Sequence, residues 1–288
     1  MDELALGAVA AVVASALFSA GLVLQSLEAR TVPPEHSLRL SLIGGLLGRR
    51  RWVLGGLLMV AGFGFHVGAL LLAPLTVVQP SLAAGLLVLL VVGARSSAEP
   101  IGARELLAVA AITLGVVGLT LTGPERTTVT GGALALALGL GALGAVALLP
   151  HALAALDCRH RQAGSLVATI GAGAAYSLTG LTTKLVSDRL DAGDWAGMAF
   201  WLAVTVAGAG LALVDQTTAL QRRGATQVGV IIYVMPVIVP VALAPLLVGE
   251  AWGSSAAPLA LSVATVCAGA ASLSGSRQVS TLERATRA

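Results

Sequence analysis

The chain has 288 residues, of which 57% are hydrophobic and 11% are charged, and its formal net charge is +3. A soluble domain carries about 25% charged residues, because it must cover its surface with polar groups. This composition excludes an ordinary soluble enzyme. The arginines are spread over short segments, so we expect no nucleic-acid partner. The sequence contains no catalytic triad, metal-ligand cluster or phosphate-binding loop, and we expect neither an enzyme nor a bound metal or cofactor.

Apolar runs that are long enough to cross a bilayer follow one another along the chain. A hydrocarbon core of ~30 Å needs roughly 20 residues of helix. The runs are continuous in Leu, Ala, Val and Gly, unlike the alternating pattern of an outer-membrane barrel. The predicted spans are residues 4–26, 52–72, 75–93, 104–122, 131–150, 164–186, 195–215, 226–248 and 257–275.

A further segment, residues 36–48, is a doubtful tenth span. Its 13 residues would reach only about 20 Å as a helix, so it is either a short or tilted span or an interfacial helix. The predicted fold is therefore an all-α integral membrane protein with about ten transmembrane helices, or nine if this segment does not cross.

The distribution of arginines predicts the orientation in the membrane. If Arg49, Arg50 and Arg51 are cytoplasmic and each later span crosses once, most basic residues fall on the cytoplasmic side. After residue 51, the opposite loops contain only Arg126 and Arg189, beside several acidic residues. We therefore expect a multi-pass protein of the bacterial inner (plasma) membrane with a cytoplasmic C-terminus. The side of the N-terminus depends on residues 36–48.

The two halves of the chain repeat one order of features. Ala69-Leu70, Pro80 and Glu99 in the first half correspond to Ala219-Leu220, Pro236 and Glu250 in the second. The loop charges put Glu99 inside and Glu250 outside, so the two copies point in opposite directions. Inverted repeats are typical of secondary transporters. The expected organisation is a first five-helix repeat at 1–125, a second, inverted repeat at 126–276, and a short cytoplasmic tail at 277–288.

The motifs of both halves resemble the NIPA-type magnesium transporters, within the drug/metabolite transporter superfamily. The first half contributes Trp52 and Gly55, Met59 and Gly62, Ala69, Ala73 and Pro74, Val77, Val78 and Pro80, and Gly123-Pro124-Glu125; the second contributes Gly171, Gly173, Lys184, Ala219-Leu220, Tyr233-Val234, Glu250 and Trp252. The resemblance implies a transporter of Mg²⁺. Phe63 and His66 stand where the family has an acidic residue and an asparagine, and a hard cation needs oxygen ligands.

Polar and helix-breaking residues inside the predicted spans are the candidate functional residues, because such groups are costly in a membrane. His66 could bind substrate or relay a proton. Lys184 is the only lysine in the sequence, and its alternative role is to reach the headgroups. Asp215 is either a gate or a partner of Arg222 or Arg223. The expected substrate-binding residues are His66, Gln79, Tyr176, Lys184, Asp215 and Tyr233, and the expected helix breaks are Pro80, Pro236 and Pro240.

These features predict a small-solute transporter that works by alternating access. The expected substrate is a small metabolite or a divalent cation, with Mg²⁺ as the one that the resemblance implies. We also expect His66, Tyr176 and Tyr233 to face one polar cavity between the halves. Two alternatives stay open: a flippase for a lipid-linked substrate, and a membrane scaffold or regulator that transports nothing. The lipid bilayer is a partner in each case, and a homodimer is compatible with the sequence.

Overall fold

A computed structural model describes residues 3–29, 46–86, 102–122, 127, 131–156, 163–222, 225–250 and 256–274, and all of its regular secondary structure is helical. The helices are α1 (Glu3–Ala29), α3 (Arg50–Leu72), α4 (Leu75–Leu82), α6 (Ala103–Thr122), α7 (Ala133–Leu156), α8 (Ala163–Asp191), α9 (Trp195–Arg222), α10 (Ala225–Leu247) and α11 (Ala256–Ser274). The prediction of an all-α fold is confirmed. The doubtful segment 36–48 lies almost wholly outside the described residues.

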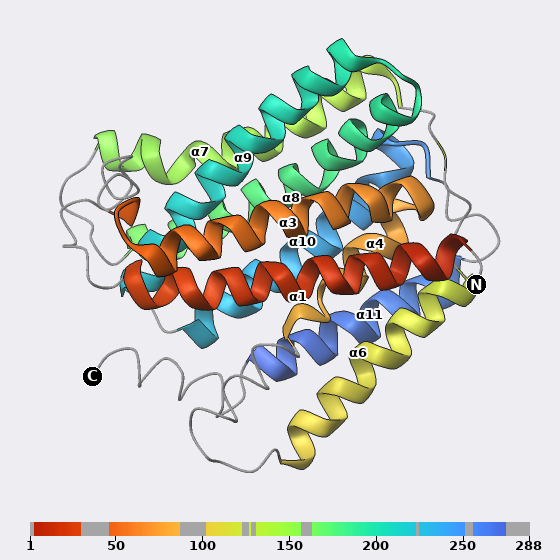
Figure 1. The fold of residues 1–288 in the computed structure, drawn as a ribbon, viewed down its shortest axis with the longest axis horizontal. Coiled ribbons are helices and arrows are strands. Elements are labelled where there is room, and N and C mark those ends of the chain that lie inside the picture. The colour runs from red at the N-terminus through yellow and green to blue at the C-terminus, as the bar shows by residue number, and fades with distance from the viewer. Residues whose placement is uncertain are drawn as a thin grey trace.

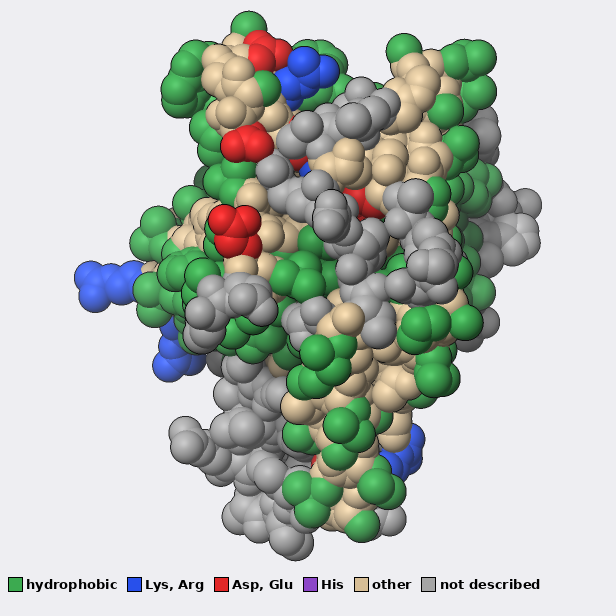
Figure 2. Space-filling model, turned by 90° about the vertical axis from the view of Figure 1, so that its right-hand side faces the viewer, with side chains coloured by type: hydrophobic (Ala, Val, Ile, Leu, Met, Phe, Trp, Pro, Cys, Tyr) green, Lys and Arg blue, Asp and Glu red, His purple; other side chains and the backbone are tan. Residues whose placement is uncertain are grey.

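Four described helices are long and apolar enough to cross a membrane: α1, α3, α7 and α9. Their outer faces expose large apolar side chains, such as Val60 on α3, Leu134 on α7 and Val206 on α9. Figure 2 shows hydrophobic side chains over the flanks of the molecule, with acidic side chains gathered toward one part of the face in view. An all-α membrane protein fits these features. Four helices among the described residues meet this criterion, which is fewer than the nine or ten predicted spans.

Helix α8 occupies the centre of the bundle. It packs against α7, α9, α10, α3 and α4, while α1 pairs with α3 and α6 pairs with α11. In Figure 1, α7 and α9 lie at one edge, α6 and α11 at the opposite edge, and α8, α10 and α4 between them. A helix that is buried on all sides usually contains only apolar residues. Helix α8 is an exception, because its buried residues include Ser177, Thr182, Thr183, Lys184 and Ser187.

The predicted span 75–93 begins as a short helix, α4. Pro74 precedes it, and the helix ends at Leu82, two residues after Pro80. The backbone N–H groups of Ala83 and Ala84 donate to the carbonyls three residues earlier, which tightens this end of the helix. Pro80 therefore lies within the last turn of α4.

Helix α10 behaves differently from α4. It continues from Ala225 to Leu247 with Pro236, Pro240 and Pro245 inside it. The expected interruption at Pro236 and Pro240 is thus not an end of the helix. Each proline still removes one backbone donor and frees a carbonyl one turn earlier.

Candidate functional site

Lys184 lies at the centre of a buried ionic cluster near one end of α8. Its side chain is completely buried, and Nζ donates to Asp188 Oδ1 at 2.5 Å and to the backbone carbonyl of Thr127 at 2.7 Å. Glu250 Oε1 lies 4.0 Å from the same nitrogen and is also completely buried. We define the Lys184 cluster as Lys184, Asp188 and Glu250. The Lys184 side chain thus points into the protein in this structure, and not outward as it would to reach the headgroups.

Glu250 connects this cluster to the first residues of α4. Its two carboxylate oxygens accept hydrogen bonds from the backbone N–H groups of Leu75 and Thr76, at 2.8 and 3.1 Å. These N–H groups belong to the first turn of the helix and have no partner within it, so the carboxylate caps the positive end of α4. Burial raises the pKa of the Glu250 carboxyl, while the Leu75 hydrogen bond and the positive charge of Lys184 oppose the rise.

Gln79 lies against α8 one turn away from Lys184. Its amide fills the space beside Gly180, where any added Cβ would collide with the Gln79 side chain. The Gln79 side chain is 2% exposed, and its Nε2 has no hydrogen-bond partner among the described residues; the same holds for the hydroxyl of Thr76. Helix α4 therefore carries two buried polar groups, the Gln79 amide nitrogen and the Thr76 hydroxyl, that have no hydrogen-bond partner among the described residues.

Tyr176 lies two turns from Lys184 on the same side of α8. Its hydroxyl donates to Gln216 Oε1 on α9 at 2.9 Å. Other hydroxyls of α8 donate to carbonyls of their own helix, as Ser177, Thr179 and Thr183 do to residues four positions earlier. Tyr176, Gly180 and Lys184 follow one another at helical spacing, so a polar stripe runs along buried α8.

Asp215 on α9 lies in a second polar site. Its side chain is completely buried, and Oδ1 lies 2.8 Å from His151 Nε2 on α7. The geometry falls short of a hydrogen bond, so the contact is a close approach of two ionisable groups. We expected a partner in Arg222 or Arg223, whose side chains lie outside the described residues. The sequence did not identify His151.

His66 of α3 packs against an aromatic side chain of α1. Its ring meets Phe18 of α1 edge to face, with the ring centroids 6.2 Å apart. The imidazole is 4% exposed, and its Nε2 has no hydrogen-bond partner among the described residues.

The described contacts place the candidate residues at several positions in the bundle. The ring of His66 packs against Phe18, whereas Tyr176 bonds to Gln216. The side chain of Tyr233 lies outside the described residues. The common cavity of His66, Tyr176 and Tyr233 therefore stays a prediction. Tyr176 and Lys184 do lie on one side of α8, and Gln79 of α4 packs against Gly180 between them. These three residues form the candidate site.

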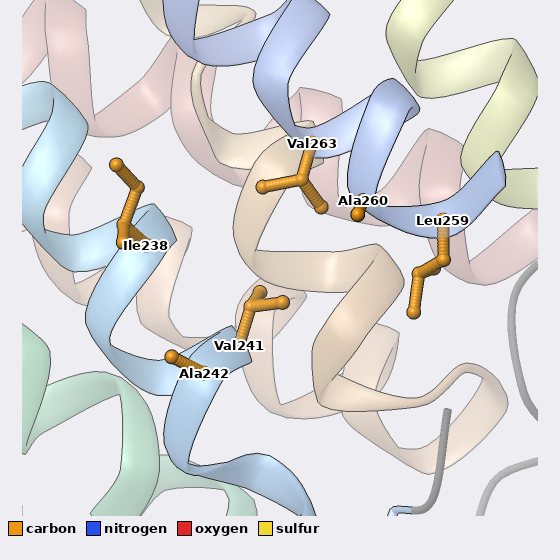
Figure 3. A pocket seen from close by; sticks show the side chains of 6 residues that line it. All are labelled: Ile238, Val241, Ala242, Leu259, Ala260 and Val263. Carbon is orange, nitrogen blue, oxygen red and sulfur yellow. The ribbon is translucent and has the colours of Figure 1, made fainter. Parts of the chain in front are cut away.

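A small pocket lies between α10 and α11 and contains none of the candidate residues. Its volume is about 120 Å³, and Figure 3 shows that side chains of both helices line it: Ile238, Val241, Ala242, Leu259, Ala260 and Val263. All of these side chains are apolar. We refer to it as the α10–α11 pocket.

Three residues of these sites were not predicted: Asp188, Glu250 and His151. Asp188 lies two residues beyond the predicted span 164–186, although its position four residues after Lys184 is the spacing of a helical ion pair. Glu250 enters the prediction from sequence through the internal repeat and the family resemblance, without a role in the site. No spacing in the sequence connects His151 to Asp215, because helices α7 and α9 are not adjacent in the chain. The chain matches no family model, no curated protein and no solved structure.

Proposed function

We propose that the protein is a membrane transporter that carries a small solute by alternating access, with residues 1–125 and 126–276 as its two moving halves. The observation that carries this proposal is the position of Glu250. This residue belongs to the second half, yet its carboxylate caps helix α4 of the first half and lies 4.0 Å from Lys184.

The energetic cost of such a contact supports a functional role. Buried charges in a membrane are expensive, and they are usually retained where a protein binds or moves a solute. A buried ion pair contributes little net stability compared with apolar packing, so stability alone does not account for it. We infer that the contact between Glu250 and α4 closes one side of the transporter. A solute that weakens this contact would then favour the opposite state.

The relation between the halves is part of the same proposal. Helices at matching positions in the two halves contact each other, namely α6 with α11 and α4 with α10. This pairing supports two related halves, each ending in one helix of the α6–α11 pair. It also agrees with the resemblance to the drug/metabolite transporter superfamily, which stays a proposal.

Mg²⁺ is the first substrate to test, and its affinity should be weak. Phe63 replaces the acidic residue that the NIPA-type family has at this position, so an oxygen ligand is missing. Phe63→Glu should therefore strengthen Mg²⁺ binding. Tight and selective binding of Mg²⁺ by the unchanged protein would contradict this ligand argument.

The test of the proposed function is uptake by purified protein in liposomes. Mg²⁺ entry is followed with an entrapped fluorescent indicator, and other solutes are first selected by thermal-shift screening against divalent cations, amines and amino acids. Glu250→Gln should lower uptake at least tenfold, because the neutral amide offers one acceptor oxygen in place of two. Glu3→Gln, at an exposed position, is the matched control. Unchanged uptake by Glu250→Gln, or no uptake of any solute by the unchanged protein, would favour the scaffold alternative.

A flippase for a lipid-linked substrate is the second candidate, and the α10–α11 pocket favours it. The pocket is entirely apolar and opens between two helices, beside exposed side chains such as Ile238 and Leu261. A recess of this kind fits part of an acyl chain. The flippase predicts that a labelled polyprenyl phosphate crosses liposome membranes that contain the protein, and that Ala260→Trp, which fills the pocket, stops the movement. Equal rates with and without protein would exclude it.

A further inference from the structure

We infer that His151 and Asp215 form a proton-binding pair, in which the imidazole exchanges protons between the membrane surface and the buried carboxyl. The pair stands apart from the Lys184 cluster, and the proposed transport does not use it. Proton binding at this site can be measured without any solute. A coupling of that proton to solute movement would rest on the proposed function.

The depth of the two groups suits an exchange with the surface. His151 lies five residues before the end of α7, or about 7.5 Å at the rise of a helix, and its side chain is 26% exposed. Asp215 lies seven residues before the end of α9 and is completely buried. The partly exposed imidazole is thus closer to the end of its helix than the buried carboxyl that it approaches at 2.8 Å.

The surroundings of Asp215 favour the binding of a proton by its carboxyl group. Oδ2 has no hydrogen-bond partner among the described residues, and Oδ1 has only the close approach of His151. On α8, Gly171 leaves the space that the carboxyl occupies, since a Cβ there would lie 2.7 Å from Oδ2 and 2.6 Å from Pro150 Cγ. A buried, unpaired carboxylate is costly, and binding a proton removes its charge.

Several of the described charged groups on the neighbouring helices pair with each other. On α8, Lys184 and Asp188 pair with each other toward the opposite end of the helix. On α1, Glu28 pairs with Arg49 at 2.8 Å. Gln216, the residue after Asp215 on α9, is bonded to Tyr176 of α8. Helix α10 has no Asp, Glu, His, Lys or Arg in its sequence.

The proton transfer needs no further reactant. The imidazole of His151 takes a proton from water at the surface and becomes an imidazolium. The two side chains stand 2.8 Å apart, so a small rotation would complete the hydrogen bond. The imidazolium then gives its Nε2 proton to Asp215 Oδ1, so that the carboxylate becomes a carboxylic acid and the imidazole is neutral again. The reverse sequence returns the proton to the water.

The test is infrared difference spectroscopy of the full chain in liposomes, stepped from acidic to alkaline pH. We expect the C=O band of a protonated, buried carboxyl to titrate in the unchanged protein and to be absent in Asp215→Asn. Asp191→Asn, at an exposed carboxyl, is the matched control and should leave the band unchanged. A band that persists unaltered in Asp215→Asn would overturn the inference.

A second variant keeps the inference testable if Asp215→Asn does not fold. His151→Gln changes a partly exposed side chain and should shift the pH midpoint of the band by about one unit or more, because the ionisable neighbour is gone. The same midpoint in His151→Gln and in the unchanged protein would contradict the role of the imidazole. Since neither readout requires transport, failure of the uptake experiment would leave this inference standing.

Discussion

At the scale of single residues, the contact between Gly180 and Gln79 is the tightest point of the polar stripe. A methyl group at position 180 would collide with the Gln79 amide. Gly180→Ala should therefore lower the free energy of unfolding in detergent by about 1–3 kcal/mol, the usual cost of overpacking, and should also slow uptake. Gly144→Ala, where a Cβ meets nothing within 4 Å, is the control. Equal stability of the two variants would show that Gln79 can turn away freely.

The Lys184 cluster makes a sharper prediction. Lys184→Met removes the buried ammonium group that Asp188 and Glu250 approach, and breaking such a buried pair costs about 3–5 kcal/mol. The double variant Lys184→Met with Asp188→Asn should recover part of that loss, because one of the two buried negative charges is gone. Chemical unfolding in detergent measures both values. A double variant that is less stable than Lys184→Met alone would show that the two side chains do not act on each other.

The sequence could identify single residues of the site but not their partners. Lys184 and Asp215 were both found, because an ionisable residue in an apolar run is conspicuous. Their partners Glu250 and His151 come from other helices, and only the packing of the bundle brings them close. Neither the hydropathy nor the spacing of a single chain contains that information.

At the scale of helices, the α6–α11 pair depends on glycines at close contacts. A Cβ at Gly115 of α6 would lie 2.5 Å from Val266 Cγ2 and 2.8 Å from the carbonyl of Ser262 on α11. Small residues allow membrane helices to approach in this way. Gly115→Leu should separate the pair and lower the melting temperature in detergent, whereas Gly141→Leu on α7, which faces open space, should not. Equal melting temperatures would mean that α6 and α11 can separate without loss.

Helix boundaries were predicted well where apolar runs end at turns, and less well where a polar residue was taken as an end. The span 52–72 corresponds to α3, Arg50–Leu72, because Pro74 follows it closely. The predicted span 195–215 ends at Asp215, yet α9 continues to Arg222. Asp215 can lie inside the helix because the carboxyl faces His151 and Gly171 instead of lipid. Tertiary packing thus decides which polar residues a span can contain.

At the scale of the whole molecule, the orientation in the membrane follows from the loop charges and stays a prediction. In a chain without its native cysteines (Cys158→Ser and Cys267→Ser), we expect Ala192→Cys to react with an impermeant maleimide in intact cells. Gln221→Cys, at the opposite end of α9, should react only after lysis. Labelling of Gln221→Cys from outside would reverse the orientation, including the expected cytoplasmic C-terminus.

The hydroxyl groups of α8 have a consequence for movement within the bundle. Ser177, Thr179 and Thr183 satisfy their hydrogen bonds on their own helix, so these bonds travel with α8 whatever its neighbours do. Among the described side chains of α8, the polar links to other helices are few, such as Tyr176 to Gln216 and Lys184 toward Glu250. Thr182 adds one further link, because it accepts a hydrogen bond from Thr205 of α9 at 2.9 Å. A movement of the neighbouring helices relative to α8 would have to break these links between helices, whereas the hydrogen bonds of Ser177, Thr179 and Thr183 would stay intact.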